Sequence, residues 1–205
     1  MNEKLAEAIT KGDRNSVQSI VNESLTNGEK AESILNDSMV TAMREIGEKF
    51  SRNEIYVPEM LIAARAMQSG LDILEEALVA SGHKTLGKVA IGTVKGDLHD
   101  IGKNLVAIML KGAGYEVNDL GVNCDITKYE KAVDDGAQIV LCSALLTTTM
   151  PYMKTVVDHF KDNENVKVVI GGAPVTQDYA DSISADGYGS DAYNAVVAID
   201  QMLSA

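Results

Sequence analysis

Residues 88–111 read KVAIGTVKGDLHDIGKNLVAIMLK, and this stretch decides the fold. It opens with a β-branched apolar run, Lys88–Val94, which is typical of a strand buried on both faces. Helical spacing follows over Ile101–Lys111 and ends at Gly112 and Gly114. A strand followed directly by a helix is the repeating unit of a parallel sheet that is covered by helices.

The same alternation continues to the end of the chain. We expect strands at Lys88–Val94, Tyr115–Leu120, Gln138–Cys142, Val166–Ile170 and near Asp186–Tyr188, and helices at Ile101–Lys111, Lys128–Asp135, Met153–Lys161, Tyr179–Ser184 and Ala192–Leu203. Five such units predict a flavodoxin-like (Rossmann-type) five-stranded parallel sheet of order 2-1-3-4-5 over residues 86–205. Ligands of such sheets bind beyond the carboxyl ends of the strands, at the topological switch point between the first and third strands.

The part before residue 85 has helical spacing throughout. Four apolar stripes are present: Leu5, Ala8 and Ile9; Val17, Ile20, Val21 and Leu25; Ile34, Leu35, Met39, Val40, Met43 and Ile46; and Leu61, Ala64, Met67, Leu71, Leu74 and Leu78. Asp13 is a suitable N-cap for the second helix, and Pro58 suits the first turn of the fourth. The fold class is therefore α + α/β: a four-helix bundle over 1–85, a linker at Ser81–Thr85, and the sheet domain over 86–205.

Composition excludes several classes of function. The chain has 205 residues and a net charge of −12, which disfavours nucleic acid and anionic membrane surfaces as partners. Apolar runs are too short for a membrane span, and the N-terminus does not resemble a signal peptide. Cys124 and Cys142 are expected to be reduced thiols in a cytoplasmic protein, and two cysteines are too few for a four-thiolate iron–sulfur cluster.

The residues between the first strand and its helix have the chemistry of a metal site. His99 lies between Asp97 and Asp100, and Gly96 and Gly102 allow close approach of a large ligand. A histidine that binds a metal usually donates its second ring N–H to a carboxylate, a role that Asp97 suits. The alternative is an ordinary loop histidine beside a helix N-cap. The other histidines, His83 and His159, are expected at the surface.

Two further segments follow neighbouring strands. Ser143–Pro151 contains four hydroxyl residues, one of which is expected to cap the helix opened by Pro151. Gly171–Pro174 is either a turn or backbone cleared for a flat ligand. The chain has no Walker or G-x-G-x-x-G phosphate motif. A response regulator needs clustered acids and a later lysine, a pattern that His99 fits poorly.

Together these motifs resemble a known family. Asp97-x-His99-x-x-Gly102, Ser143-x-Leu145 and Gly171-Gly172 resemble the signature of cobalamin-binding domains. The helical part, with Gly47–Phe50 and Tyr56–Leu61, resembles the cap bundle that precedes this domain in methionine synthase and in methyltransferase corrinoid proteins. The resemblance covers nearly the whole chain and implies that the cofactor is cobalamin or a related corrinoid, such as methylcobalamin.

The resemblance also implies roles for individual residues. His99 would be the lower ligand of cobalt, Asp97 would hydrogen-bond His99, and Thr149 would extend that chain of hydrogen bonds. Corrinoid contacts are implied for Gly96, Leu98, Asp100, Ile101, Gly102, Ser143, Leu145, Thr147, Gly171, Gly172, Ala173 and Tyr188, and an apolar cap for Phe50, Val57, Met60 and Leu61.

The implied function is that of a methyl carrier. The chain would take a methyl group from a substrate:corrinoid methyltransferase and pass it to a second methyltransferase that acts on an acceptor such as tetrahydrofolate or a thiol coenzyme. It is too short to include a TIM barrel and is not expected to turn over alone. Repair of oxidised cobalt would need a reductive activase. The alternatives are a subunit of an adenosylcobalamin mutase, a cobalamin sensor and a storage protein.

Overall fold

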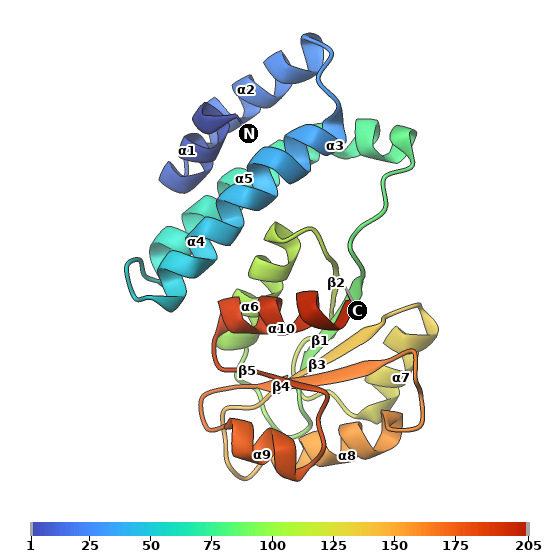
Figure 1. Cartoon of the computed structure of the whole chain (residues 1–205). Helices are drawn as coiled ribbons and strands as arrows, with labels where there is room; N and C mark the ends of the chain where they lie inside the picture. The colour runs from blue at the N-terminus through green and yellow to red at the C-terminus, as the bar shows by residue number, and fades with distance from the viewer. Residues whose placement is uncertain (1, 204–205) are drawn as a thin grey trace. The chain divides into compact units, whose positions relative to one another are not determined.

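The computed structural model describes residues 2–203, which divide near Thr85 into a helical unit and an α/β unit (Figure 1). The helical unit contains α1 (Glu3–Lys11), α2 (Arg14–Thr26), α3 (Ala31–Ile34), the π-helical segment η1 (Leu35–Val40), α4 (Thr41–Ser51) and α5 (Val57–Ser81). Because α3, η1 and α4 follow one another without a break, they form one continuous helix. The described part of the unit therefore has the four helices that the apolar stripes predicted. The π-helical turn was not predicted; it adds a residue to the turn, which lets Leu35, Met39 and Val40 all be buried.

Local signals begin and end these helices as expected. The Asp13 carboxylate caps α2 by accepting the Ser16 N–H at 3.1 Å. Pro58 lies in the first turn of α5. Farther along α5, Gly70 permits close packing, because a Cβ there would lie 2.8 Å from Met39 Cε and 2.9 Å from Val17 Cγ1. Among the described residues, no helix is both long and apolar enough to cross a membrane.

The α/β unit contains one five-stranded parallel sheet of order β2-β1-β3-β4-β5, which confirms the predicted topology. Its elements are β1 (Lys88–Thr93), α6 (Ile101–Gly112), β2 (Glu116–Asp119), α7 (Ile126–Asp134), β3 (Ile139–Ser143), α8 (Pro151–Phe160), β4 (Lys167–Gly171), α9 (Gln177–Ser182), β5 (Gly187–Gly189) and α10 (Ala192–Leu203). The observed bounds differ from the predicted ones by a few residues at most. Ser143 and Gly171 are the last residues of their strands, where they pair with each other.

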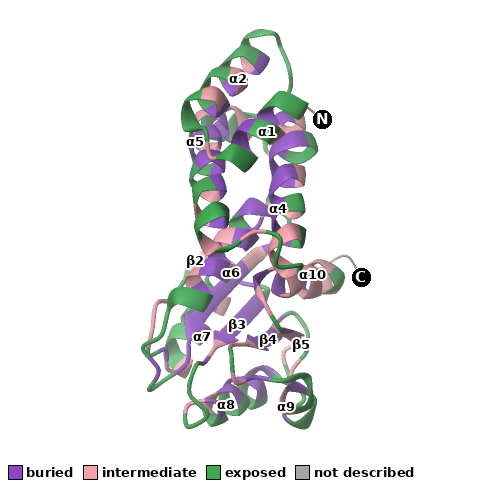
Figure 2. Ribbon diagram, turned by 90° about the vertical axis from the view of Figure 1, so that its left-hand side faces the viewer, coloured by how far each residue is buried: buried purple, intermediate pink, exposed green. Residues whose placement is uncertain are grey.

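Helices cover both faces of this sheet. Helices α6 and α10 lie on one face, and α7, α8 and α9 lie on the other (Figure 1). Burial colouring shows the central strands as the most buried part of the unit (Figure 2). A large apolar cluster joins the second face to its helices through residues such as Tyr129, Val140, Phe160 and Ile170. This packing leaves the carboxyl ends of β1, β3 and β4 to carry the loops that form the site.

Two expectations about local structure need correction. No hydroxyl residue caps α8: its N-cap is Met150, in helical conformation and without a side-chain cap, because a preceding turn with Met150 N–H on Leu146 O leads straight into the helix. His83 is not freely exposed, since its side chain is 18% accessible and its Nδ1 lies 3.4 Å from Glu32 Oε1. His159 is more exposed, at 39%, and faces Glu130.

Candidate functional site: a carboxylate-held histidine at the sheet switch point

The carboxyl ends of β1, β3 and β4 enclose a pocket of about 420 Å³. It is lined by Leu98, His99, Asp100, Ile101, Gly102, Ser143, Ala144, Leu145, Gly172 and Ala173. The pocket therefore lies at the switch point between β1 and β3, where the sheet order reverses direction, as the topology predicted. Of these lining residues, Ala144 alone was not among the residues expected to contact a cofactor.

Asp97 is the centre of the hydrogen-bond network beside this pocket. Its side chain is fully buried. Oδ1 accepts the His99 backbone N–H at 3.0 Å and lies 2.7 Å from His99 Nδ1. Oδ2 accepts the Leu145 N–H at 2.9 Å and the Thr149 hydroxyl at 2.7 Å. One carboxylate thus ties the β1–α6 loop to the β3–α8 loop.

These contacts fix the charge of Asp97 and the proton position on His99. Burial by itself raises the pKa of the Asp97 carboxyl, but the hydrogen bonds from His99, Leu145 and Thr149 outweigh it and hold that pKa well below its usual range. An ionised carboxylate can only accept hydrogen bonds, so His99 Nδ1 must carry the proton. In the neutral ring the other nitrogen, Nε2, then has a free lone pair, which is the form that binds a metal.

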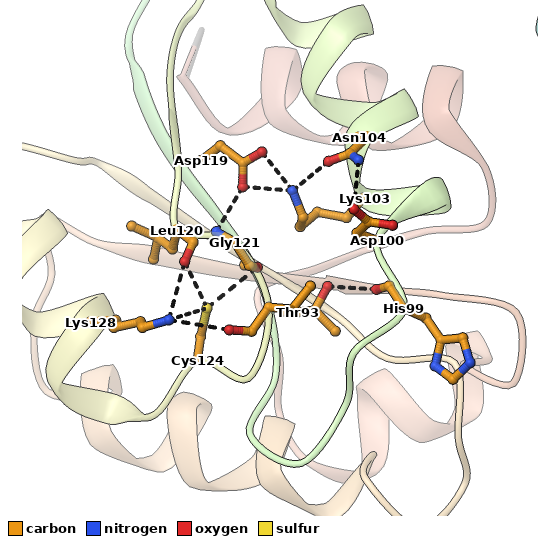
Figure 3. A network of polar contacts seen from close by, with 12 residues as sticks. Thr93, His99, Asp100, Lys103, Asn104, Asp119, Leu120, Gly121, Cys124 and Lys128 are labelled. Carbon is orange, nitrogen blue, oxygen red and sulfur yellow. Dashed lines mark hydrogen bonds and ion pairs between the residues drawn. The ribbon is translucent and has the colours of Figure 1, made fainter.

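The His99 backbone is held as well as its ring. The buried Thr93, at the end of β1, donates its hydroxyl to the His99 carbonyl at 2.8 Å (Figure 3). The His99 ring is still 50% accessible, because the contacts to Thr93 and Asp97 use its backbone and one ring edge. The orientation of the His99 ring at the pocket is therefore fixed by hydrogen bonds, while half of its side-chain surface stays accessible.

Glycines clear the pocket at two points. Gly172 has φ +129°, and a Cβ there would lie 1.9 Å from the Ala144 carbonyl oxygen, so no larger residue fits that turn. At Gly102 a Cβ would meet nothing within 4 Å, so the open space there adjoins the pocket. A Cβ at Gly171 would approach the Gly189 carbonyl oxygen at 2.9 Å, which gives Gly171 a packing role between β4 and β5.

Several predicted contact residues lie outside the pocket lining. Thr147 is exposed on the β3–α8 loop. Tyr188 is half-buried and donates its hydroxyl to Val175 O at 2.9 Å. Gly96 donates its N–H to Asn123 Oδ1 at 2.8 Å. Asp97, Thr149 and Gly171 do not line the pocket either. Asp97 and Thr149 belong to the hydrogen-bond network beside it, and Gly171 packs against Gly189.

The four residues expected to form a cap lie in the helical unit, at the end of α4 and the start of α5. Met60 is fully buried, whereas Phe50, Val57 and Leu61 are partly accessible. None of the four lines the pocket described above. Their role as a cap remains a prediction.

Sequence reasoning missed three residues that support the His99 loop, which we define as residues 94–100. They are Thr93, Asn123 and Lys103 (Figure 3 labels Thr93 and Lys103). For Lys103, a sequence signal was available, because a lysine inside the apolar helix Ile101–Gly112 interrupts the pattern three residues from its start. The contacts of Thr93 and Asn123 depend on loops that meet only in the folded chain.

The donor set fits one kind of metal centre. Within residues 2–203, no group of three or more His, Cys, Asp or Glu side chains converges on a point that could hold a bare ion. A single neutral imidazole edge beside a largely apolar pocket instead suits a metal that a macrocycle already ligates. His99 would hold such a metal through Nε2, and the pocket would receive part of the organic group.

The fold and this site define a protein that binds a large metal-containing cofactor, and comparison with known proteins agrees. Residues 87–197 match the B12 binding domain family, and residues 1–75 match a second family that is also described as a B12 binding domain. The chain is 41% identical to the trimethylamine corrinoid protein of Methanosarcina barkeri, over 98% of this chain and 95% of the relative. It is 38% identical to the dimethylamine corrinoid protein of the same organism, over 98% and 97%.

Solved structures give the same assignment. The methanol:cobalamin methyltransferase complex MtaBC from Methanosarcina barkeri contains a chain with a TM-score of 0.85 and 29% identity, covering 98% of this chain and 78% of that one. A cobalamin-binding protein from Desulfitobacterium hafniense has a TM-score of 0.80 and 28% identity, with coverage of 97% and 96%. The chain belongs to the corrinoid protein family with B12 binding domains, and its cofactor is cobalamin or a related corrinoid.

Proposed function

We propose that this protein carries a methyl group between two methyltransferases. The observation that carries the proposal is the fully buried, ionised Asp97, which holds His99 at the switch point of a B12 binding domain with Nε2 free. When bound, the corrinoid supplies a cobalt centre that can accept and release a methyl group. The chain supplies orientation, a switchable axial ligand and exclusion of water.

His99 would hold the metal through Nε2. Its Nδ1 lies 2.7 Å from Asp97 Oδ1, which fixes the orientation of the ring. An Nε2 atom that is not bound to metal could hold a proton, with the ionised Asp97 beside the ring. Thr149 keeps its hydroxyl on Asp97 Oδ2 and so maintains the position of the carboxylate. Binding of the metal would thereby be coupled to protonation at one ring atom.

The lining of the pocket suits the remainder of the corrinoid. Ser143, Leu145 and Gly172 would border the slot for the displaced nucleotide tail. Leu98 and Ile101 are 70% and 79% accessible, although both are large and apolar. Large apolar side chains exposed together at a pocket mark a binding surface, and here they would contact the face of the corrin ring.

The helical unit would shield the opposite face of the cofactor. Phe50, Val57 and Leu61 supply partly accessible apolar surface suited to keeping water from a reactive cobalt–carbon bond, and Met60 is buried in the same unit. Because transfer needs access to the same cobalt face, this unit would have to move aside when a methyltransferase binds. The segment Ser81–Gly87, with glycines at positions 82 and 87, would serve as the hinge.

The relatives indicate the class of methyl donor. Those with high identity over nearly the whole chain are named for trimethylamine and dimethylamine, which favours a methylated amine as the donor here. The partners would be a substrate:corrinoid methyltransferase, a corrinoid:acceptor methyltransferase acting on a thiol coenzyme or tetrahydrofolate, and a reductive activase. The match of residues 1–75 to a B12 binding domain family supports methyl transfer over mutase chemistry, because mutase subunits usually lack this helical unit.

Loading the protein with cobalamin and replacing His99 tests the ligand assignment. In wild-type protein, the electron paramagnetic resonance spectrum of Co(II) should show nitrogen splitting that is replaced by the isotope pattern when the histidines carry ¹⁵N. His99→Ala should abolish that histidine-derived splitting. His159→Ala is the matched control, since His159 also pairs with a carboxylate but lies away from the pocket. Histidine-derived splitting that survives in His99→Ala would refute the assignment.

A transfer assay tests the proposed reaction itself. The protein, reduced and mixed with a trimethylamine- or dimethylamine-specific methyltransferase and the amine, should gain one methyl group per corrinoid. His99→Ala should lower the yield. If the protein binds cobalamin through His99 but accepts no methyl group from any methylated amine, the donor class is wrong and the cofactor assignment stands.

A further inference from the structure

The molecule contains a buried lysine that the proposed function does not use. The Lys103 side chain, in the first turn of α6, is only 1% accessible. Its ammonium lies 2.6 Å from both carboxylate oxygens of Asp119 and 2.6 Å from Asn104 Oδ1 (Figure 3). Asp119 is 42% accessible, so only the lysine is withdrawn from water. A buried charge is poor evidence of a gain in stability, because an apolar side chain of similar volume often serves as well. The contacts of Lys103 therefore call for another explanation.

These contacts anchor the downstream end of the His99 loop. Asp119 is the last residue of β2, and its Oδ1 also accepts the Gly121 N–H at 2.9 Å. Lys103 therefore ties the first turn of α6 to the end of the edge strand. Asn104 continues the connection, because its side-chain amide donates to Asp100 Oδ2 at 3.1 Å and its backbone N–H donates to Asp100 O at 2.7 Å. Asp100 is the residue that follows His99.

The upstream end of the same loop is anchored on the same strand. Asn123 lies four residues after the end of β2 and has a left-handed backbone conformation, with φ 49°. Its side chain accepts the Gly96 N–H at 2.8 Å, and its backbone N–H donates to Asp97 O at 3.0 Å. Asn123 thus holds the upstream part of the His99 loop and Asp119, through Lys103, its downstream end, where Thr93 also holds the His99 carbonyl.

We propose that Lys103 and Asp119 are positioning residues for His99: the ion pair between the buried Lys103 ammonium and the partly exposed Asp119 carboxylate fixes the end of the loop so that the ring edge stays directed at the pocket. This inference rests on the proposed role of His99 as a ligand. Without the pair, Asp97 would still hold the His99 ring, but the backbone from Asp100 to Lys103 would lose its connection to β2. The Asp100 end of the loop could then shift while Asn123 still holds Gly96 and Asp97, and a ligand that shifts by even a fraction of an ångström binds a metal less well.

The test compares Lys103→Met with a matched control. Methionine keeps an unbranched side chain of similar length and removes the ammonium. Lys88→Met is the control, because Lys88 also pairs with a carboxylate of β2, that of Glu116 at 3.0 Å, but at the amino end of the strand, away from the His99 loop. The readouts are the dissociation constant for cobalamin, the fraction of Co(II) with histidine-derived nitrogen splitting, and hydrogen exchange of the His99 backbone N–H in corrinoid-free protein.

Lys103→Met should weaken cobalamin binding by about tenfold, the order expected when support for a metal ligand is removed. It should also lower the histidine-ligated fraction and speed exchange of the His99 N–H, while Lys88→Met leaves all three unchanged. Unchanged values in folded Lys103→Met, or equal changes in Lys88→Met, would overturn the proposal.

A second variant keeps the test decisive if Lys103→Met does not fold. Asp119→Asn keeps an oxygen for the Lys103 ammonium and the Gly121 N–H but removes the charge, so it should shift the same three readouts in the same direction by a smaller factor. No shift in Asp119→Asn would count against the pair as positioning residues. If wild-type protein itself shows no histidine ligation, the proposed role of His99 fails, whereas the exchange measurement still tests whether the pair fixes the loop.

Discussion

Replacing Asp97 by asparagine should reverse the proton position on His99. Asp97 accepts hydrogen bonds at both oxygens, from the His99 N–H and ring at Oδ1 and from the Leu145 N–H and Thr149 hydroxyl at Oδ2. An amide can accept at only one of these positions, and its NH₂ must face donors at the other. The less costly choice places the NH₂ toward His99, because the ring can switch tautomer and accept at Nδ1.

The structure sets the size of this effect. With the NH₂ toward His99, the backbone N–H of His99 loses its acceptor, which costs about 1–3 kcal/mol. The bonds from the Leu145 and Leu146 N–H groups and from the Thr149 hydroxyl persist but change from charged to neutral, a loss of about 0.5–1 kcal/mol each. Asp97→Asn should therefore lower the free energy of unfolding by about 2.5–6 kcal/mol. More importantly, the ring proton moves to Nε2, which removes the lone pair that a metal needs.

Long-range ¹H–¹⁵N NMR of the histidine rings measures the tautomer directly in corrinoid-free protein. Wild-type His99 should show the Nδ1–H form, and Asp97→Asn should show the Nε2–H form together with cobalamin binding weakened by about 10–100-fold. Thr149→Val is the control, because it removes one hydrogen bond to Oδ2 but keeps the charge and the Nδ1–H form. If His99 in folded Asp97→Asn keeps its proton on Nδ1, the argument that the carboxylate sets the tautomer is wrong.

Two further predictions follow from the pocket and the core. Gly102→Leu should leave the corrinoid-free protein as stable as wild type, because a Cβ there meets nothing within 4 Å, and denaturant unfolding checks this. The leucine should lower cobalamin affinity more than tenfold by filling the pocket. A binding titration with unchanged affinity would contradict this prediction. Burial raises the pKa of the Cys142 thiol from 9.0 to about 12, so the unfolded chain loses this proton first and stability should fall as pH rises from about 9 toward 12. Denaturant unfolding measured between pH 9 and 12 should show that the free energy of unfolding falls more steeply with pH for wild type than for Cys142→Ala. Equal slopes for the two proteins would refute the raised pKa of the Cys142 thiol.

The sequence alone determined the elements, their order and the segments that build the site. Strand and helix periodicity are local properties of residues 86–203, and alternating elements leave few topologies, so the sheet order followed. Because parallel strands end at the same edge, the residues after β1, β3 and β4 had to meet, and the site could be located around His99, Ser143 and Gly172 without coordinates.

Tertiary structure alone decided several of the contacts that support the site. The residue pattern indicated that one hydroxyl near Pro151 would cap a helix, whereas in the folded chain that helix has no side-chain cap. The bond from Thr149 to Asp97, which lies 52 positions earlier, was implied only by the family resemblance. The support of the His99 loop by Lys103 and Asn123 depends on where an edge strand ends relative to its neighbour. Such contacts join residues whose local patterns are independent of one another, so their pairing is fixed only by the register and twist of the assembled sheet.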